Sequence, residues 1–227
     1  ADIIDIGGES TRPGSNPVPE LDECNRVIPV IESIKKINSK ILISVDTYKS
    51  YVAKRAIEAG ADIVNDISGL TFDSKMIPLL SEKDIPVIIM HINGRPKTMQ
   101  NNPLYNDLIK EIKHFLIKQC ELAEENGIKK SNIILDPGIG FGKSFEHNFT
   151  LIRRLKEISD LGYPLMIGPS RKAFIGDALN LPPDERLEGT LATVTAGILN
   201  GANIIRAHDI KEVSRAVLVT EKIMRSA

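Results

Sequence analysis

Short apolar runs recur along the chain, and each is followed by a longer segment in which apolar residues return with helical spacing. The runs lie at residues 3–6, 41–45, 63–65, 86–90, 133–135, 165–167 and 204–206. They are apolar throughout rather than alternating, which predicts strands that are covered on both faces. The intervening segments predict amphipathic helices at residues 21–37, 49–59, 74–82, 105–126, 148–159, 186–200 and 211–224. This alternation is typical of βαβ units that build a parallel sheet.

A weak internal repeat extends this pattern. Residues 60–65 (GADIVN) and 201–206 (GANIIR) both have a glycine suited to end a helix, followed by a strand. Residues 1–5 (ADIID) match them without the glycine, so we expect a helix and a further strand to precede Ala1. With that unit, the seven strand–helix units become the eight of a (β/α)8 barrel. We therefore predict an α/β TIM barrel, formed by a single domain over residues 1–227 and truncated at its N-terminus; a doubly wound open sheet is the alternative.

Composition and charge narrow the class of protein. The 227 residues are 42% hydrophobic, which suffices for one large core. The formal net charge is −1 and the charges are interspersed, so neither a nucleic-acid surface nor a membrane surface is expected. No apolar run approaches the ~18 residues that a membrane-spanning helix needs. Cys24 and Cys120 lack the spacing of a disulfide or metal-binding pair, which predicts buried thiols in a reducing compartment such as the cytoplasm.

Polar side chains follow every predicted strand. They are Asp5, Asp46, Asn65, His91, Asp136, residues 170–172 and residues 206–209. In a parallel barrel the carboxyl ends of all strands meet at one rim, where active sites lie. Each residue alone also fits a structural role, because Asp136 begins a D-P-G turn and Asp46 or Asp209 could cap a helix. Their recurrence at all seven strand ends favours an active site.

One glycine-rich segment, PGIGFGKS at residues 137–144, ends like a nucleotide-binding P-loop. The first glycine of that pattern falls on Pro137, which has no N–H for a phosphate and a fixed φ. The G-x-G-x-x-G pattern fails as well, because its third glycine falls on Lys143. We therefore interpret these glycines as places where the backbone closely approaches a flat ligand or a neighbouring loop.

Seven motifs at the strand ends carry a resemblance to a known family. They are DIGGESTRPG (5–14), SVDTYK (44–49), NDISG (65–69), MHINGRPKTMQNNPLYND (90–107), DPGIGFGK (136–143), GPSRKAFIG (168–176) and RAHD (206–209). Together they resemble the dihydropteroate synthases of the folate pathway, a family of pterin-binding (β/α)8 enzymes. The resemblance implies a cytoplasmic transferase, a sulfonamide target, that condenses 6-hydroxymethyl-7,8-dihydropterin diphosphate with 4-aminobenzoate to 7,8-dihydropteroate and diphosphate. It also implies a homodimer formed through outer helices.

The resemblance implies roles for individual residues. The pterin would be held by Asp46, Asn65, Asp136 and Lys172, with Met90, Phe141 and Gly168 around the ring. The 4-aminobenzoate would lie under a mobile loop with Thr11, Arg12 and Pro13, flanked by Ser170 and Lys172. The diphosphate would be bound by Thr11, Arg206 and His208. The expected catalytic residues are Asp46, Lys172, Arg206 and His208.

The chain departs from the family pattern at two places. The family's first strand and its LNVTPDSFSDGG-type loop, which supplies a ligand to Mg²⁺, do not occur in this sequence. We therefore expect Mg²⁺ as a cofactor whose ligand comes from that loop, and we assign no metal ligand within residues 1–227. Residues 92–95 also differ from the commonest family residues and receive no role.

The residue types at the strand ends suit pterin binding independently of the resemblance. Asp136 can accept the adjacent donors on the 2-amino-pyrimidinone edge of a pterin, in charge-assisted hydrogen bonds worth ~1.5–3 kcal/mol. Asn65 offers both a donor and an acceptor to a ring edge of mixed polarity. Lys172 can donate to ring N5 or to the ring carbonyl oxygen; its alternative role is an ion pair with a glutamate.

The departure of diphosphate requires cations near the leaving group. Arg206 can bind it bidentately and His208 can donate one more hydrogen bond. The free N–H groups of the helix that begins near Asp209 point to the same corner. Asp46 can stabilise the positive charge that develops on the pterin methylene. We therefore expect ionisation before attack by the neutral amine, without a covalent enzyme intermediate; a packed histidine is the alternative for His208.

Two other functions are compatible with the sequence. A pterin-dependent methyltransferase domain shares the barrel and the pocket carboxylates, but it needs neither the Ser-Arg-Lys motif at 170–172 nor the Arg-x-His pair. A barrel that binds pterin without turnover is the second alternative. Release of diphosphate in the presence of 4-aminobenzoate distinguishes the three functions.

Overall fold

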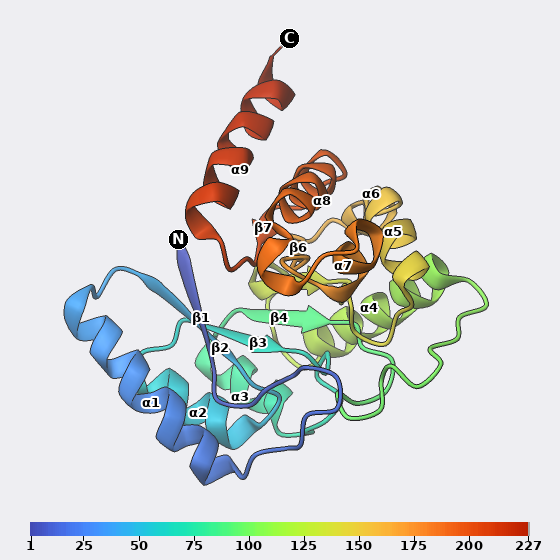
Figure 1. Ribbon diagram of the computed structural model, residues 1–227. Helices are drawn as coiled ribbons and strands as arrows, with labels where there is room; N and C mark the ends of the chain where they lie inside the picture. Colours follow the sequence, from blue (N-terminus) through green and yellow to red (C-terminus); the bar gives the residue numbers. More distant parts are fainter. Residues whose placement is uncertain (227) are drawn as a thin grey trace.

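The computed structural model describes residues 1–226, with the strands at the centre of the molecule and the helices around them (Figure 1). The strands are β1 (Ile3–Gly7), β2 (Leu42–Asp46), β3 (Ile63–Asp66), β4 (Val87–Met90), β5 (Ile133–Asp136), β6 (Met166–Ile167) and β7 (Ile204–Ile205). The helices are α1 (Glu20–Ile37), α2 (Ser50–Ala59), α3 (Met76–Lys83), α4 (Leu108–Glu125), α5 (Phe145–Arg153), α6 (Lys156–Ser159), α7 (Ala173–Leu179), α8 (Leu187–Leu199) and α9 (Ile210–Arg225). All seven predicted strands are present, and their bounds differ from the predicted ones by one residue at most.

The strands are parallel and follow one another in space as they do along the chain. Strands β1 to β5 form one sheet in that order, and β6 pairs with β7 in a second. A parallel bridge between Leu135 and Leu165 joins the two at β5 and β6. A doubly wound sheet would reverse its strand order at a switch point, whereas a barrel keeps the chain order. The structure therefore has the topology of the predicted (β/α)8 fold and not that of the open-sheet alternative.

The strand side chains divide into an inner and an outer layer. The inner layer is a cluster of apolar residues inside the curved sheet: Ile3, Ile63, Ile88, Ile134, Met166 and Ile204. The alternate residues, such as Val64 and Leu135, belong to the larger core between the sheet and the helices. Burial on both faces explains why the strands are apolar throughout in the sequence. Because successive side chains alternate, the residue two positions after each inner residue also faces the interior.

Two helices differ from the prediction. The helix expected at 148–159 is two helices, because α5 already begins at Phe145 and ends before α6 begins. The early start is fixed by Ser144, whose hydroxyl accepts from the His147 N–H at 3.1 Å while its own N–H donates to His147 Nδ1 at 3.2 Å. Helix α7 was not predicted, since it has only seven residues and no side-chain cap at its N-terminus.

Both cysteines have the predicted environment. Cys24 and Cys120 are free and buried. None of the helices within the described residues combines the length and the apolar character that crossing a membrane requires.

Candidate active site

The strand register places a set of predicted site residues, together with Asp5, at the carboxyl rim. Each lies two positions after an inner-layer residue: Asp5 after Ile3, Asn65 after Ile63, Met90 after Ile88, Asp136 after Ile134, Gly168 after Met166 and Arg206 after Ile204. The same alternation that turns the apolar residues inward therefore turns these residues into the mouth of the barrel.

A small cavity opens at this rim. Nine of the predicted site residues line it: Thr11, Asp46, Asn65, Met90, Asp136, Phe141, Gly168, Lys172 and Arg206. Ile67 and Met166 complete the lining, and neither was predicted. Ile67 packs with Met90 and Phe141 in one apolar cluster, so one wall of the cavity suits the face of a flat ring.

Three buried oxygens at the rim lack partners. One side-chain oxygen each of Asp5, Asp46 and Asn65 is buried without a hydrogen bond from any part of the described chain. A buried acceptor without a donor costs free energy, and such groups are concentrated at sites that receive a ligand. The strand ends thus present acceptors to a ligand that carries several donors.

Arg206 crosses the rim from β7 to the first two strands. Its Nε lies 2.7 Å from Asp5 Oδ2, and one terminal nitrogen lies 3.4 Å from Asp46 Oδ2. Burial and the neighbouring Asp5 carboxylate raise the pKa of Asp46, while Arg206 opposes that rise. Asp5 was predicted at the end of the first strand but was given no role in the site, although it lies two positions after Ile3 in the same register as the other rim residues.

Asp136 and Lys172 both line the cavity, and the charge of each shifts the pKa of the other. Asp136 Oδ1 accepts from the Gly138 N–H at 2.7 Å, so the turn alternative accounts for one of its two oxygens. Lys172 donates to the Ile139 carbonyl oxygen, and its Nζ lies 4.6 Å from the centre of the Phe141 ring. Burial lowers the pKa of Lys172 to about 8, although the Asp136 carboxylate opposes this shift. Lys172 is therefore held at the cavity by a carbonyl and an aromatic ring, not by a glutamate.

A buried lysine behind this wall was not predicted. Lys143 is 2% exposed, and its Nζ lies 3.0 Å from His91 Nδ1 and 3.0 Å from the Phe141 carbonyl oxygen. Burial lowers the pKa of Lys143 to about 7, and burial together with Lys143 lowers that of His91 to about 2. The neutral imidazole therefore accepts from Lys143. His91 follows β4 as predicted, but it supports the Phe141 loop and does not line the cavity.

The last strand end is organised by Ser170. Its Oγ lies 2.9 Å from His208 Nδ1 and accepts from the His208 N–H at 3.2 Å. His208 is exposed, so the packed-histidine alternative is wrong. Asp209 occupies the N-cap position of α9 without a cap hydrogen bond and instead accepts from Arg171 Nε at 3.0 Å. Asp46 caps no helix either, because the N-cap residue of α2 is Lys49.

Four predicted site residues lie beside the cavity and not in its lining. They are Arg12, Pro13, Ser170 and His208. Arg12 and Pro13 are exposed in the loop that brings Thr11 to the cavity. This loop touches the segment after β4, because the Gly14 N–H donates to the Pro96 carbonyl oxygen at 3.1 Å.

The carboxyl rim of this parallel barrel combines buried acceptors, two cations and an apolar wall. This combination is typical of a barrel enzyme that acts on a flat, polar substrate. The family model that matches residues 1–208 is described as a pterin binding enzyme. The chain is 47% identical over 226 residues to the dihydropteroate synthase of Synechocystis sp., which covers 99% of this chain and 78% of that protein. The chain belongs to the dihydropteroate synthase family.

Solved structures agree with this assignment. The Yersinia pestis dihydropteroate synthase in a sulfonamide complex superposes with a TM-score of 0.96 at 40% identity, covering 100% of this chain and 82% of that one. The Xanthomonas albilineans dihydropteroate synthase with 4-aminobenzoic acid gives 0.94 at 36% identity, covering 100% and 81%. The (β/α)8 fold and the transferase function in folate biosynthesis are thereby confirmed, and the methyltransferase alternative is set aside.

Proposed function

We propose that the cavity binds the pterin diphosphate with its ring between Asp136, Asn65 and Lys172. The observation that carries this proposal is that Asp46 and Asn65, which line the cavity with Asp136, each hold a buried side-chain oxygen without a partner within residues 1–226. The 2-amino-pyrimidinone edge of a pterin supplies adjacent donors of the kind these acceptors lack. Phe141 and Met90 line the cavity and would contact the faces of the ring.

The diphosphate would leave toward Arg206, His208 and the N-terminus of α9. Arg206 pairs with Asp5 and Asp46 in this structure, so its guanidinium is already held at the rim. Ser170 fixes the ring of His208 through Nδ1, which leaves Nε2 free to donate to a phosphate oxygen. The unpaired backbone N–H groups at the start of α9 add partial positive charge at the same corner.

The substitution would proceed by ionisation of the pterin C–O bond before the amine attacks. Positive charge that develops on the methylene would be stabilised by Asp46, which lies on the strand between Asp5 and Asn65. The 4-aminobenzoate, under the loop of Thr11, Arg12 and Pro13, then forms the C–N bond and loses one proton to solvent. The Xanthomonas structure with 4-aminobenzoic acid and the Yersinia sulfonamide complex support the choice of this second substrate.

Magnesium is the cofactor that this reaction implies, and it would neutralise charge on the diphosphate. Within residues 1–226 no group of three or more His, Cys, Asp or Glu side chains is arranged to hold a metal ion. Asp5 and Asp46 are turned toward Arg206, which is a poor neighbour for a divalent cation. The described residues therefore do not form a magnesium site by themselves, and the steps above use only side chains of this chain.

Replacing Asp136 tests the pterin site. Asp136→Ala removes both acceptor oxygens, whereas Asp136→Asn keeps an acceptor for the Gly138 N–H and loses the charge. Both variants should weaken pterin diphosphate binding about 100-fold in titration calorimetry, since two charge-assisted bonds are lost. The thermal midpoint of Asp136→Asn should stay close to that of the unmodified protein. Unchanged pterin affinity in either folded variant would remove Asp136 from the anchor role.

Mass spectrometry tests the order of the chemical steps. The protein is incubated with pterin diphosphate alone, quenched in acid and measured intact. We expect the unmodified mass, because no side chain of the cavity is proposed to attack the methylene carbon. A protein heavier by one pterin would show a covalent intermediate and contradict the ionisation mechanism.

We also propose that the protein is a cytoplasmic homodimer that acts without nucleic acid or membrane. The two free, buried thiols support the compartment. Exposed apolar side chains on the outer helices, among them Leu199, Leu218 and Ile223, support a contact between protomers. Light scattering of the purified protein measures the oligomeric state.

A further inference from the structure

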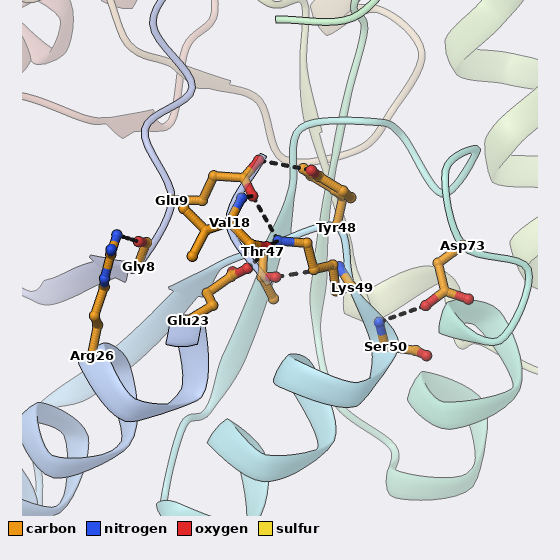
Figure 2. Close-up of polar contacts among 10 residues, drawn as sticks. All are labelled: Gly8, Glu9, Val18, Glu23, Arg26, Thr47, Tyr48, Lys49, Ser50 and Asp73. Carbon is orange, nitrogen blue, oxygen red and sulfur yellow. Dashed lines mark hydrogen bonds and ion pairs between the residues drawn. The ribbon is translucent and has the colours of Figure 1, made fainter. Parts of the chain in front are cut away.

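A buried ion cluster outside the cavity joins three segments of the chain. Lys49, at the N-cap of α2, lies between Glu9 of the loop after β1 and Glu23 in the first turn of α1 (Figure 2). Lys49 Nζ lies 2.6 Å from Glu9 Oε2 and donates to Glu23 Oε2. It also donates to the Val18 carbonyl oxygen at 2.7 Å, so all three N–H donors of the ammonium group are used.

The same cluster holds both ends of the loop that runs from Glu9 to Val18. Glu9 Oε2 accepts from the Val18 N–H at 2.7 Å, and Glu9 Oε1 accepts from the Tyr48 hydroxyl at 2.7 Å. Val18 is thus bonded through its N–H to Glu9 and through its carbonyl to Lys49. The ion pair between Glu9 and Lys49 holds the two ends of the loop together, and residues 10–17 form the loop between them.

Gly8 allows α1 to come close enough to take part. A Cβ atom at this position would lie 2.8 Å from Glu23 Cγ, which is closer than real contacts allow, and 3.0 Å from the Glu23 carbonyl oxygen, which is tighter than most. The Gly8 carbonyl oxygen also accepts from Arg26 at 2.8 Å (Figure 2). Glycine at position 8 is therefore required by the helix that supplies Glu23.

The cluster is buried, and its contacts favour the charged forms of Glu9 and Lys49. The side chains of Lys49, Glu9 and Glu23 are 12%, 7% and 1% exposed. Burial opposes charge on Glu9, but hydrogen bonds from Lys49, Val18 and Tyr48 hold its pKa below the usual value. Burial likewise opposes charge on Lys49, and the two glutamates raise its pKa nonetheless. Buried charges of this kind fix geometry strongly, because removing one partner leaves the others unpaired.

We propose that Glu9, Lys49 and Glu23 are positioning residues that fix the loop of residues 11–13 over the 4-aminobenzoate end of the cavity. The inference rests on the proposed function, which assigns that loop to 4-aminobenzoate. Within the described chain, the cavity lining includes Thr11 but none of the three cluster residues. The cluster therefore acts on a substrate only through the loop, and its removal should affect the second substrate more than the first.

Steady-state kinetics of Glu9→Gln and Lys49→Met test this proposal, with diphosphate release as the readout. Glu9→Gln keeps the size of the side chain and the acceptor for Tyr48 but loses the charge that pairs with Lys49. Both variants should raise KM for 4-aminobenzoate about tenfold, because the loop is misplaced rather than removed. The Kd for pterin diphosphate should change less than about twofold, since the strand ends that hold it are untouched. Lys49→Arg keeps the charge and should recover most of the aminobenzoate KM.

Lys35→Met is the matched control. Lys35 also joins a carboxylate and a backbone carbonyl, Asp62 and Ile41, but at the opposite rim. This variant should leave both substrate constants unchanged. Equal changes in the pterin and aminobenzoate constants of Glu9→Gln, or no change in a folded Glu9→Gln protein, would overturn the proposal. If Lys49→Met fails to fold, the substrate constants of Glu9→Gln alone test the proposal. Failure of the proposed function is seen separately, as unchanged pterin affinity in Asp136→Asn.

Discussion

The two rims of the barrel use their polar side chains differently. At the amino rim, Lys35 Nζ donates to Asp62 Oδ2 at 2.7 Å and to the Ile41 carbonyl oxygen at 2.8 Å. Asp62 Oδ2 also accepts from the Ile43 N–H at 2.8 Å. Each of these groups joins one chain segment to another, so these polar side chains of the amino rim stabilise the fold.

The carboxyl rim has the opposite arrangement. Asp5, Asp46 and Asn65 each keep one buried oxygen without a partner within residues 1–226, and Arg206 is shared between two carboxylates. Such a rim is less stable than one with complete pairing. At the carboxyl rim, incomplete pairing leaves acceptors that a substrate can complete, whereas the other two unpartnered buried oxygens of the described residues, Ser44 Oγ and Gln119 Oε1, lie in a strand interior and in α4.

Of the changes that test this difference between the rims, replacing Arg206 should have the largest effect on kcat. Arg206→Met removes the cation that would meet the charge of the departing diphosphate, so kcat should fall about 100-fold or more. Arg206→Lys keeps a charge without the planar fork and should recover only part of that loss. Diphosphate release measures both. The amino-rim variant Lys35→Met should keep the kcat of the unmodified protein. A similar loss of kcat in Lys35→Met and Arg206→Met would contradict the functional difference between the two rims.

The pH profile should show the next largest effect. Burial lowers the pKa of Lys172 to about 8, so this ammonium loses its proton at a lower pH than a free lysine. The protonated form is the one that donates to the pterin, and kcat/KM should therefore fall above pH 8, by about tenfold for each pH unit. Lys172→Arg stays charged and should remove the descending limb. A flat profile to pH 9.5 in the unmodified protein would contradict this role.

The smallest expected effect is that of Asp46→Asn on the thermal stability of the protein. The pKa of Asp46 is raised in the folded protein, so the protonated carboxyl contributes stability at low pH that is lost as the pH rises through that pKa. Asp46→Asn is neutral at every pH and should raise the midpoint of thermal unfolding at pH 7 by about 3 °C, corresponding to ~1 kcal/mol. The gain should fade toward pH 4, and kcat should fall. Lower stability of Asp46→Asn than of the unmodified protein at pH 7 would show that the buried Asp46 carboxylate does not destabilise the fold.

The sequence was sufficient to predict the strands and most of the residues that line the cavity. Strands that are buried on both faces are apolar throughout, so their positions follow from local composition. Polar residues then appear directly at their carboxyl ends, as at Asn65 and Asp136, and the parallel arrangement brings these ends together. Asp5 could have been added by the same reasoning, because it lies two positions after Ile3.

Other features depend on contacts between distant segments. Lys143 lies in a glycine-rich loop, and its burial depends on His91, which is 52 residues away. Glu23 belongs to an amphipathic helix whose first turn is acidic, a pattern that by itself indicates only a favourable helix N-terminus. Its pairing with Lys49 depends on the close approach at Gly8. No local pattern encodes these pairs, because their partners are brought together only by the fold of the whole chain.

A crystal structure with bound pterin diphosphate tests the central claim most directly. We expect the ring to lie between Asp136, Asn65 and Lys172 and the diphosphate to contact Arg206 and His208. Oxygens of Asp46 and Asn65 that lack partners in residues 1–226 should then accept from the substrate or from a water bound beside it. A pterin bound elsewhere, with those oxygens still unpartnered, would contradict the account.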